Sequence, residues 1–264
     1  MVRCFVDDNI THVEGSIDPV RDIEIIDTEL CLADLETVDN RLNKVAKLVK
    51  AHDKKAIAEE ELLHRVHEGL ENIVPARRME FTEDEEAMLY DLHLLTKKPI
   101  IFVCNVPESE AADASANPYV KAVQEFAAKE HAEVVPISAK VEADIAELPD
   151  DEAKEFLEME GMTESGLNRL IKAGFKLLGL QTYLTAGEIE SRAWTINIGT
   201  KAPQAAGKIH SDFEKGFIKA EIVSYDDLVQ CGSKQAAREK GLVRLEGKDY
   251  VMQDGDVVEF RFNV

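Results

Sequence analysis

Apolar residues recur at helical spacing along the first third of the chain. From about Val20 a helical pattern begins, and its seam residues stand three and four positions apart: Leu35, Val38, Leu42, Val45 and Val49. The same spacing resumes after the polar residues 52–55, at Leu63, Val66, Leu70 and Ile73. Two helices with this seam, joined by a short polar turn, predict an antiparallel coiled-coil hairpin. The hairpin is either a partner-binding arm or a self-packed helical subdomain.

A further helix is predicted after the hairpin. Thr82 and Glu85 stand three residues apart, as the two partners of a capping box do. The helix that they open closes at residues 97–99 and carries three apolar residues on one face: Met88, Leu92 and Leu95.

A strand–helix–strand unit follows. Residues 100–104 form a continuous apolar run of the kind buried in a parallel sheet. Asn117 followed by Pro118 caps a helix, and residues 134–137 form the next strand, while residues 1–6 predict another short, buried strand. Because ligands of open α/β sheets bind at the carboxyl ends of the strands, the loops after these strands are candidate binding loops.

The pattern changes after Thr182. Residues 193–198, 220–223 and 257–262 alternate in polarity or favour β-branched residues, and residues 202–207 can open a short helix. This pattern predicts a small α+β module around a curled sheet. The fold class is therefore α/β followed by α+β, in a multidomain chain.

Composition limits the environment of the protein. No apolar stretch in the 264 residues approaches the ~18 residues of a membrane span, so we expect a cytoplasmic protein without a membrane partner. The four cysteines lie far apart with no C-x-x-C motif, which predicts reduced thiols. Apart from His64 and His67, the histidines show no metal-ligand spacing, and no metal site is predicted.

Charge is distributed unevenly in this acidic chain, whose formal net charge is −21. Residues 181–264 carry 11 Lys or Arg and 13 Asp or Glu, whereas residues 1–180 carry 20 and 39. An acidic surface repels nucleic acid. We therefore expect no DNA partner, and we expect any RNA or ribosome contact in the charge-balanced C-terminal part.

Two short motifs stand at the ends of predicted strands: Asn105-Val106-Pro107-Glu108 and Ser138-Ala139-Lys140. In P-loop nucleotide hydrolases an Asn at a strand end hydrogen-bonds near N7 of the purine, and a carboxylate three residues later accepts hydrogen bonds from the base edge. Asp suits guanine, which offers two adjacent donors, so the longer Glu108 weakens the case for guanine. Each motif alone fits an ordinary loop, but the pair at this spacing predicts a purine site.

The phosphate-binding motif of such proteins does not occur in this sequence. No G-x-x-x-x-G-K-[ST] string is found in the 264 residues, and Gly207-Lys208-Ile209 and Gly232-Ser233-Lys234 have the wrong order and context. Catalysis of phosphoryl transfer is almost entirely positioning and charge stabilisation of the phosphates. We therefore predict no catalytic residues, and no ATP hydrolysis by this chain alone.

These motifs resemble the Obg-like ATPase family, and within it the YchF subfamily of P-loop nucleotide hydrolases. The resemblance also rests on the opening Val2-Arg3-Cys4-Phe5 and on four later segments: residues 180–187, 192–194, 210–217 and 261–264. It covers nearly the whole chain. It implies that ATP binds in preference to GTP and is hydrolysed slowly with Mg²⁺, and that the protein associates with the ribosome.

The resemblance also implies a domain layout and a set of base-binding residues. The parts are a partial P-loop sheet of a nucleotide-binding domain (residues 1–18 and 97–180), an inserted helical coiled-coil domain (19–96) and a TGS domain, which is a ubiquitin-like β-grasp module (181–264). Val106, Ser138 and Ala139 would act mainly through their backbone. The full set of residues implied at the base is Asn105, Val106, Glu108, Ser138, Ala139 and Lys140.

The chain departs from the family at its start. In the family the phosphate loop, the magnesium-coordinating Ser or Thr and both switches precede the position of Val2, so the Mg²⁺ ligands are absent from this sequence and we expect an N-terminally truncated relative. Two interpretations stay open. The chain is the C-terminal portion of a nucleotide-hydrolysing protein, or it is a non-enzymatic ribosome- or RNA-binding module that uses the helical arm and the TGS domain.

Overall fold

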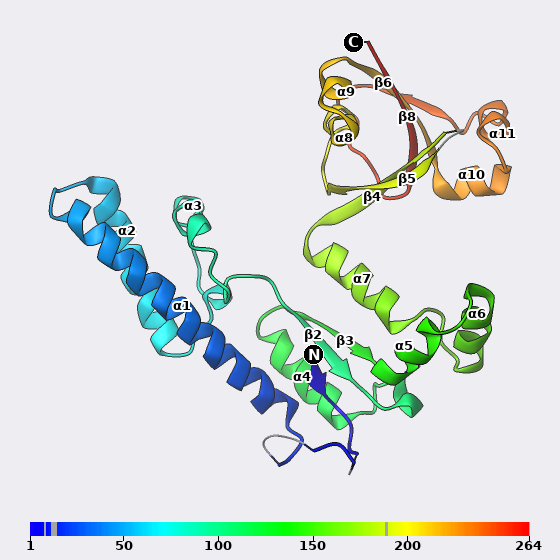
Figure 1. The fold of residues 1–264 in the computed structure, drawn as a ribbon. Coiled ribbons are helices and arrows are strands. Elements are labelled where there is room, and N and C mark those ends of the chain that lie inside the picture. Colours follow the sequence, from blue (N-terminus) through cyan, green and yellow to red (C-terminus); the bar gives the residue numbers. More distant parts are fainter. Residues whose placement is uncertain (8, 12–14, 188–189, 264) are drawn as a thin grey trace. The chain divides into compact units, whose positions relative to one another are not determined.

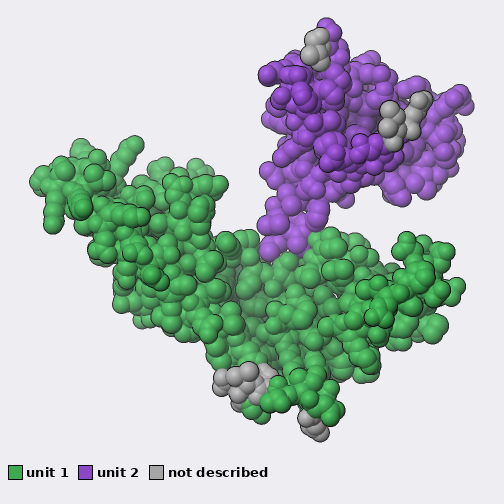
Figure 2. All heavy atoms as spheres, in the orientation of Figure 1, with its two compact units in different colours: residues 1–173 green, residues 174–264 purple. Residues whose placement is uncertain are grey.

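The computed structural model describes residues 1–7, 9–11, 15–187 and 190–263, so the last residue of the motif at 261–264 lies outside the described part. The chain forms two compact units, residues 1–173 and 174–264, which Figure 2 shows in different colours. Among the described helices, none is long and apolar enough to cross a membrane.

A two-helix hairpin extends from the first unit (Figure 1). Helices α1 (Pro19–Val49) and α2 (Lys54–Glu71) pack side by side and are joined by residues 50–53. Each begins after an aspartate whose carboxylate accepts backbone N–H groups of the first turn. The predicted seam residues form the hairpin core. Ile73 is the exception: α2 ends at Glu71, and Ile73 has a left-handed φ of 56° and is 38% exposed, so its place in the seam is wrong.

The helix after the hairpin is shorter than predicted. The capping box is present and opens α3 (Glu83–Leu89). A 3₁₀ turn, η2 (Tyr90–Leu92), follows, and the left-handed backbone of His93 (φ 50°) ends the helical run. Leu95 therefore does not continue the apolar face of α3 and is 42% exposed.

Buried polar contacts fix the base of the hairpin. Arg77, in the 3₁₀ turn η1 (Ala76–Arg78), donates to the carboxylates of Asp27 and Glu130, each at 2.7 Å. The three side chains are 9%, 6% and 1% exposed. Asp34 accepts hydrogen bonds from two successive backbone N–H groups that follow η2. These contacts hold α1 against the chain segments on both sides of α3.

Three parallel strands form the sheet of the first unit, in the order β1 (Val2–Arg3), β2 (Ile101–Asn105) and β3 (Glu133–Ile137). Strand β1 ends at Arg3 and is therefore shorter than the predicted buried strand over residues 1–6. After β1, Cys4 is buried, whereas Val6 is 70% exposed. Pro136, which cannot donate to a sheet ladder, lies in the edge strand β3.

Helices cover both faces of this sheet (Figure 1). Helix α4 (Pro118–Ala128), which starts where Asn117 and Pro118 predict, packs its buried residues against Phe102 and Cys104. On the other face, Val103 and Val135 pack with Ala173 of α7 (Gly166–Leu177). The remaining elements of the unit are η3 (Glu108–Glu110), α5 (Ala139–Ala146) and α6 (Asp150–Met159).

The second unit is a mixed five-stranded sheet in the order β5-β4-β8-β6-β7. Strands β4 and β8 are parallel, and the other neighbours are antiparallel. Strands β5, β6 and β8 occur where the sequence predicts strands, and α8 is the predicted short helix, whereas no prediction covers β4 and β7. The elements are β4 (Leu180–Ala186), β5 (Ser191–Asn197), α8 (Ala202–Ile209), α9 (Ser211–Lys215), β6 (Phe217–Ser224), α10 (Tyr225–Cys231), α11 (Lys234–Glu239), β7 (Arg244–Glu246) and β8 (Asp256–Phe262).

The core of the second unit lies between this sheet and α8. Tyr183 is fully buried, and its hydroxyl donates to the carbonyl of Ala205 at 2.8 Å. Phe260 packs edge-on against the Tyr183 ring, and Trp194 stacks beside it. Small alanines on α8 let the helix approach this aromatic layer closely.

Candidate functional site

A pocket with a volume of about 300 Å³ opens at the carboxyl ends of the three parallel strands. This is the edge at which open α/β sheets bind their ligands. Five of the six predicted base-binding residues line it, and Ala139 does not. The lining residues are Phe5, Val6, Asp7, Ile10, Asn105, Val106, Pro107, Glu108, Ser138 and Lys140.

Asn105 connects all three strand ends. Its backbone carbonyl accepts a hydrogen bond from the N–H of Cys4 at 2.8 Å, just beyond β1. Its side-chain Oδ1 accepts one from the backbone N–H of Ala139 at 3.0 Å, at the start of α5. The side-chain nitrogen of Asn105, Nδ2, has no hydrogen-bond partner among the described residues. The side chain therefore presents two unused N–H donors at the pocket lining.

The backbone groups near the pocket are partly used by the protein itself. The N–H of Val106 donates to the carbonyl of Ile137 at 2.9 Å, and Val106 is 2% exposed. The N–H of Ala139 is used by Asn105. Ser138 is buried at the N-cap of α5, yet its hydroxyl makes no capping hydrogen bond. Of these residues, Ser138 keeps a side-chain donor and acceptor at the pocket.

Glu108 and Lys140 form an ion pair across the pocket mouth, with Oε1 and Nζ 2.5 Å apart. The hydrogen bond and the negative charge of Glu108 raise the pKa of Lys140. Both side chains are exposed, at 46% and 70%. An exposed pair of this kind opens at little cost, so Glu108 can turn toward a ligand.

The loop after β1 forms a wall of the pocket that the sequence motifs did not indicate. Arg3 shapes this loop by donating to the carbonyls of Phe5, Asp7 and Ile10 at 3.0, 2.9 and 2.9 Å. Its guanidinium also lies 4.8 Å from the centre of the Phe5 ring. The sequence feature that could have indicated this wall is the position of residues 5–10 at the end of a predicted parallel strand.

Asn117 positions the loop that carries Glu108. Its Nδ2 donates to the carbonyl of Cys4 at 2.9 Å and to the carboxylate of Glu110 at 2.6 Å. Its Oδ1 caps α4 by accepting two backbone N–H groups. One buried amide thus joins the end of β1, the turn η3 and the start of α4.

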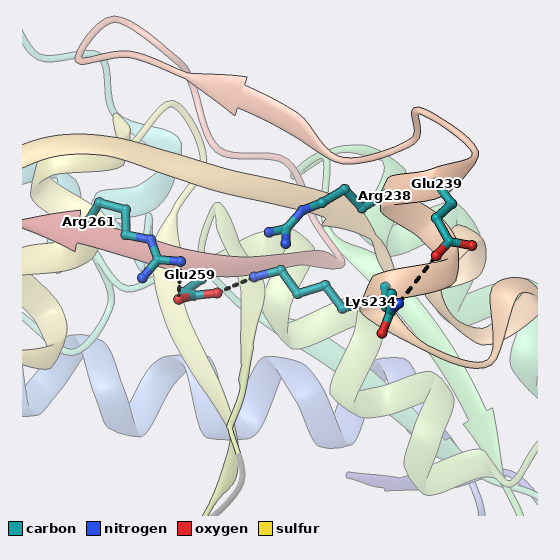
Figure 3. A pocket seen from close by; sticks show the side chains of 6 residues that line it. Lys234, Arg238, Glu239, Glu259 and Arg261 are labelled. Atoms are coloured by element: carbon teal, nitrogen blue, oxygen red, sulfur yellow. Dashed lines mark hydrogen bonds and ion pairs between the residues drawn. The ribbon is translucent and has the colours of Figure 1, made fainter.

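A larger hollow, of about 520 Å³, lies on the second unit (Figure 3). Its cations are already paired: Lys234 contacts Glu259, Arg261 lies 2.7 Å from Glu259, and Arg238 lies 2.5 Å from Glu221. When Glu221, which contacts Arg238 and Arg261 from outside the lining, is counted, three carboxylates match the three cations, and no excess positive charge is left to select an anion. Its residues are Lys234, Gln235, Arg238, Glu239, Glu259 and Arg261.

Among the described residues, no three or more His, Cys, Asp or Glu side chains are grouped so that they could hold a metal ion. His67, on α2, lies 3.1 Å from Asp39 and 3.5 Å from Glu71, and these contacts belong to the hairpin surface.

Known proteins are similar to this chain along its whole length. The family model YchF-GTPase_C, described as a protein of unknown function (DUF933), matches residues 180–263. The ribosome-binding ATPase YchF of Bacillus subtilis (strain 168) is 56% identical over 264 residues, which are all of this chain and 72% of that protein. Obg-like ATPase 1 of Rattus norvegicus is 42% identical over 268 residues, covering 100% of this chain and 67% of that protein. The solved structure of the Schizosaccharomyces pombe YchF GTPase superimposes with a TM-score of 0.81 at 34% identity, covering 98% of this chain and 70% of that one.

Proposed function

Since this chain belongs to the YchF/Obg-like ATPase family, we propose that the pocket at the ends of β1, β2 and β3 binds the purine base of ATP, and that of GTP less well. The main observation in support of this proposal is the orientation of the Asn105 side-chain amide. Its Oδ1 is held by Ala139, so the side chain can present only N–H donors to a ligand. A purine offers a matching acceptor at N7.

Glu108 supplies the complementary acceptor. The exocyclic amino group of adenine is a donor, and the carboxylate of Glu108 accepts from it after turning away from Lys140. The aliphatic part of Lys140 then packs beside the base, and Ser138 and Val106, which also line the pocket, contact the edge of the base. Guanine presents two adjacent donors that a shorter carboxylate fits better, which favours adenine here.

The polar groups that line this pocket suit a purine base and do not suit Mg²⁺. The ion requires near-octahedral oxygen ligands. The lining offers an amide, a hydroxyl and two carboxylates, of which Glu108 is paired with Lys140 and Asp7 accepts hydrogen bonds from Asn9. Because these 264 residues contain no G-x-x-x-x-G-K-[ST] loop, we propose that they do not hydrolyse ATP by themselves. Steady phosphate release that Asn105→Ala abolishes would refute this point.

The arrangement of parts is also proposed from the resemblance. We assign residues 1–18 and 97–180 to a nucleotide-binding domain, 19–96 to an inserted coiled-coil domain and 181–264 to a TGS domain. The relatives named as ribosome-binding ATPases support association with the ribosome in the cytoplasm. The alternative, a non-enzymatic ribosome- or RNA-binding module that uses the helical arm and the TGS domain, shares this association and needs no base site.

Chemical-shift mapping with adenosine tests the base site directly. In ¹H–¹⁵N spectra of the full chain, we expect shifts confined to residues 5–10, 105–108 and 138–140. Asn105→Ala should reduce them, whereas Asn43→Ala, an exposed amide on the hairpin, should not. Shifts that ignore Asn105, or none at several millimolar adenosine, would favour the non-enzymatic module.

A further inference from the structure

The pocket at the strand ends has two sides of different chemistry. One side, here named the edge, carries the hydrogen-bonding groups of Asn105 and Glu108 after β2. The other side, here named the wall, is the loop after β1, whose apolar lining residues are Phe5, Val6 and Ile10. A planar base that hydrogen-bonds with the edge needs an apolar or aromatic surface against its ring face. The wall supplies such a surface.

The backbone and the burial of this loop give it little order. Strand β1 ends at Arg3, so the wall lies beyond the sheet ladder. The N–H of Ile10 donates to the carbonyl of Asp7 at 3.2 Å and closes one turn. Val6 and Ile10 are 70% and 48% exposed, so apolar burial does not hold them in place. Loops with few buried apolar contacts open locally at low free energy.

The guanidinium of Arg3 supplies the order that the loop lacks. Its Nε, Nη1 and Nη2 donate to the carbonyls of Phe5, Ile10 and Asp7 at 3.0, 2.9 and 2.9 Å. Its central carbon Cζ lies 4.8 Å from the centre of the Phe5 ring. One planar group thus holds three carbonyls in a fixed arrangement, which the single ammonium of a lysine cannot reproduce.

Arg3 acts from outside the pocket, since it is not one of the lining residues. In the pairing of β1 with β2, Arg3 is the register partner of Asn105. The side chain that holds the wall and the amide of the edge therefore start from neighbouring positions of the same sheet. The sheet fixes where the wall begins, and Arg3 fixes the path of the loop from there.

Resting on the base site proposed above, we propose that Arg3 is a positioning residue for the nucleotide, because it holds the wall in the shape that supports the ring face of the base. A mobile wall is competent to bind for only a fraction of the time, and the apparent dissociation constant rises as that fraction falls. Stacking is tolerant of base identity, since every base has a π-face. Loss of Arg3 therefore weakens adenine and guanine nucleotides by the same factor, whereas Glu108 acts on their ratio.

Chemical-shift titrations of the full chain with AMP and with GMP test this role. Arg3→Lys keeps the positive charge and an aliphatic side chain, and we expect it to raise both dissociation constants about fivefold or more at a constant ratio. The matched control is Arg21→Lys. Arg21 also donates to a backbone carbonyl, that of Ser16 at 2.7 Å, but it does not line the pocket. Its variant should change either constant by less than about twofold.

Backbone ¹⁵N relaxation of the free chain tests the cause of the weaker binding. In Arg3→Lys without nucleotide, the order parameters of Phe5, Asp7 and Ile10 should fall, whereas those of β2 should stay at the values of a rigid backbone. The unchanged β2 values also exclude misfolding of the variant. A wall that keeps its order in Arg3→Lys would contradict the positioning role.

The titrations distinguish failure of this inference from failure of the base site. Unchanged AMP affinity in Arg3→Lys would overturn the inference and leave the base site intact. A changed ratio of AMP to GMP affinity would place the effect of Arg3 at the edge, and equal losses in Arg3→Lys and Arg21→Lys would indicate a general effect of removing a guanidinium. Absence of AMP binding by the unmodified chain would refute the base site, and this inference with it.

Discussion

Oδ1 of Asn105 accepts a hydrogen bond from the backbone N–H of Ala139 at 3.0 Å. The contact joins the end of β2 to the first residue of α5. It fixes which side of the amide faces the protein, and so leaves the nitrogen for a ligand. One side chain therefore both shapes the pocket and offers it a donor.

Replacing Asn105 by Asp separates these two roles. Aspartate keeps the acceptor toward Ala139 and removes the donor toward the base, so we expect the dissociation constant for adenosine to rise about five- to tenfold, equivalent to about 1 kcal/mol. The free energy of unfolding should change little. Asn105→Ala removes both interactions and should lower both adenosine affinity and stability, as followed by titration and urea unfolding. Unchanged adenosine affinity in Asn105→Asp would show that the amide has only a structural role.

Shortening Glu108 should change the base preference. In Glu108→Asp the carboxylate can lie beside two adjacent donors, so guanosine should gain on adenosine by about fivefold, a difference of about one hydrogen bond. Competition between the two nucleosides in a single titration measures this ratio. Glu147→Asp, an exposed acid elsewhere in the first unit, is the control. An unchanged ratio of guanosine to adenosine affinity in Glu108→Asp would show that Glu108 does not contact the base.

The buried ion pairs of Arg77 should dominate the stability of the hairpin base. Arg77→Met leaves the buried Asp27 without its partner and leaves Glu130 only its contact with Arg78, and breaking a buried ion pair typically costs about 3–5 kcal/mol. Arg41→Met breaks the more exposed pair with Glu59 and should cost less than about 1 kcal/mol. Urea unfolding of both variants gives the comparison. Similar losses of stability would mean that the Arg77 cluster adds no more than a surface pair.

Acid should weaken the same cluster through Glu130. Burial would raise the pKa of this carboxyl, but hydrogen bonds from Arg77 and Arg78 outweigh burial and lower it. A lowered folded pKa stabilises the fold above the ordinary Glu value of about 4.3, and this stability is lost as pH falls from there toward the folded pKa. The stability difference between wild type and Glu130→Gln should therefore be full at pH 7 and shrink below about pH 4. A difference that grows in acid would reverse the assigned sign.

Hydrophobic spacing and helix capping predict much of the local structure. The 3–4 spacing located the hairpin core, and the Thr82–Glu85 pair located the start of α3. The end of α3 could not be predicted in this way, because the left-handed turn at His93 depends on where the chain returns to α1. Likewise, Ile73 has the seam spacing but lies beyond the last turn of α2.

The candidate site was accessible to sequence reasoning only in part. Strand-end motifs placed Asn105 and Ser138 at one sheet edge, and both line the pocket. Val6, Asp7 and Ile10 belong to no motif quoted above, and the described part of their loop is shaped by Arg3, which donates to three of its carbonyls.

Adenosine and ATP, titrated in parallel with the full chain in Mg²⁺ buffer, test the central claim most directly. If the pocket holds the base and these residues do not grip the triphosphate, both ligands should bind with about millimolar affinity, roughly 4 kcal/mol, and within threefold of each other. ATP binding at least tenfold more tightly than adenosine would show that the 264 residues do hold the phosphates, and would contradict the account.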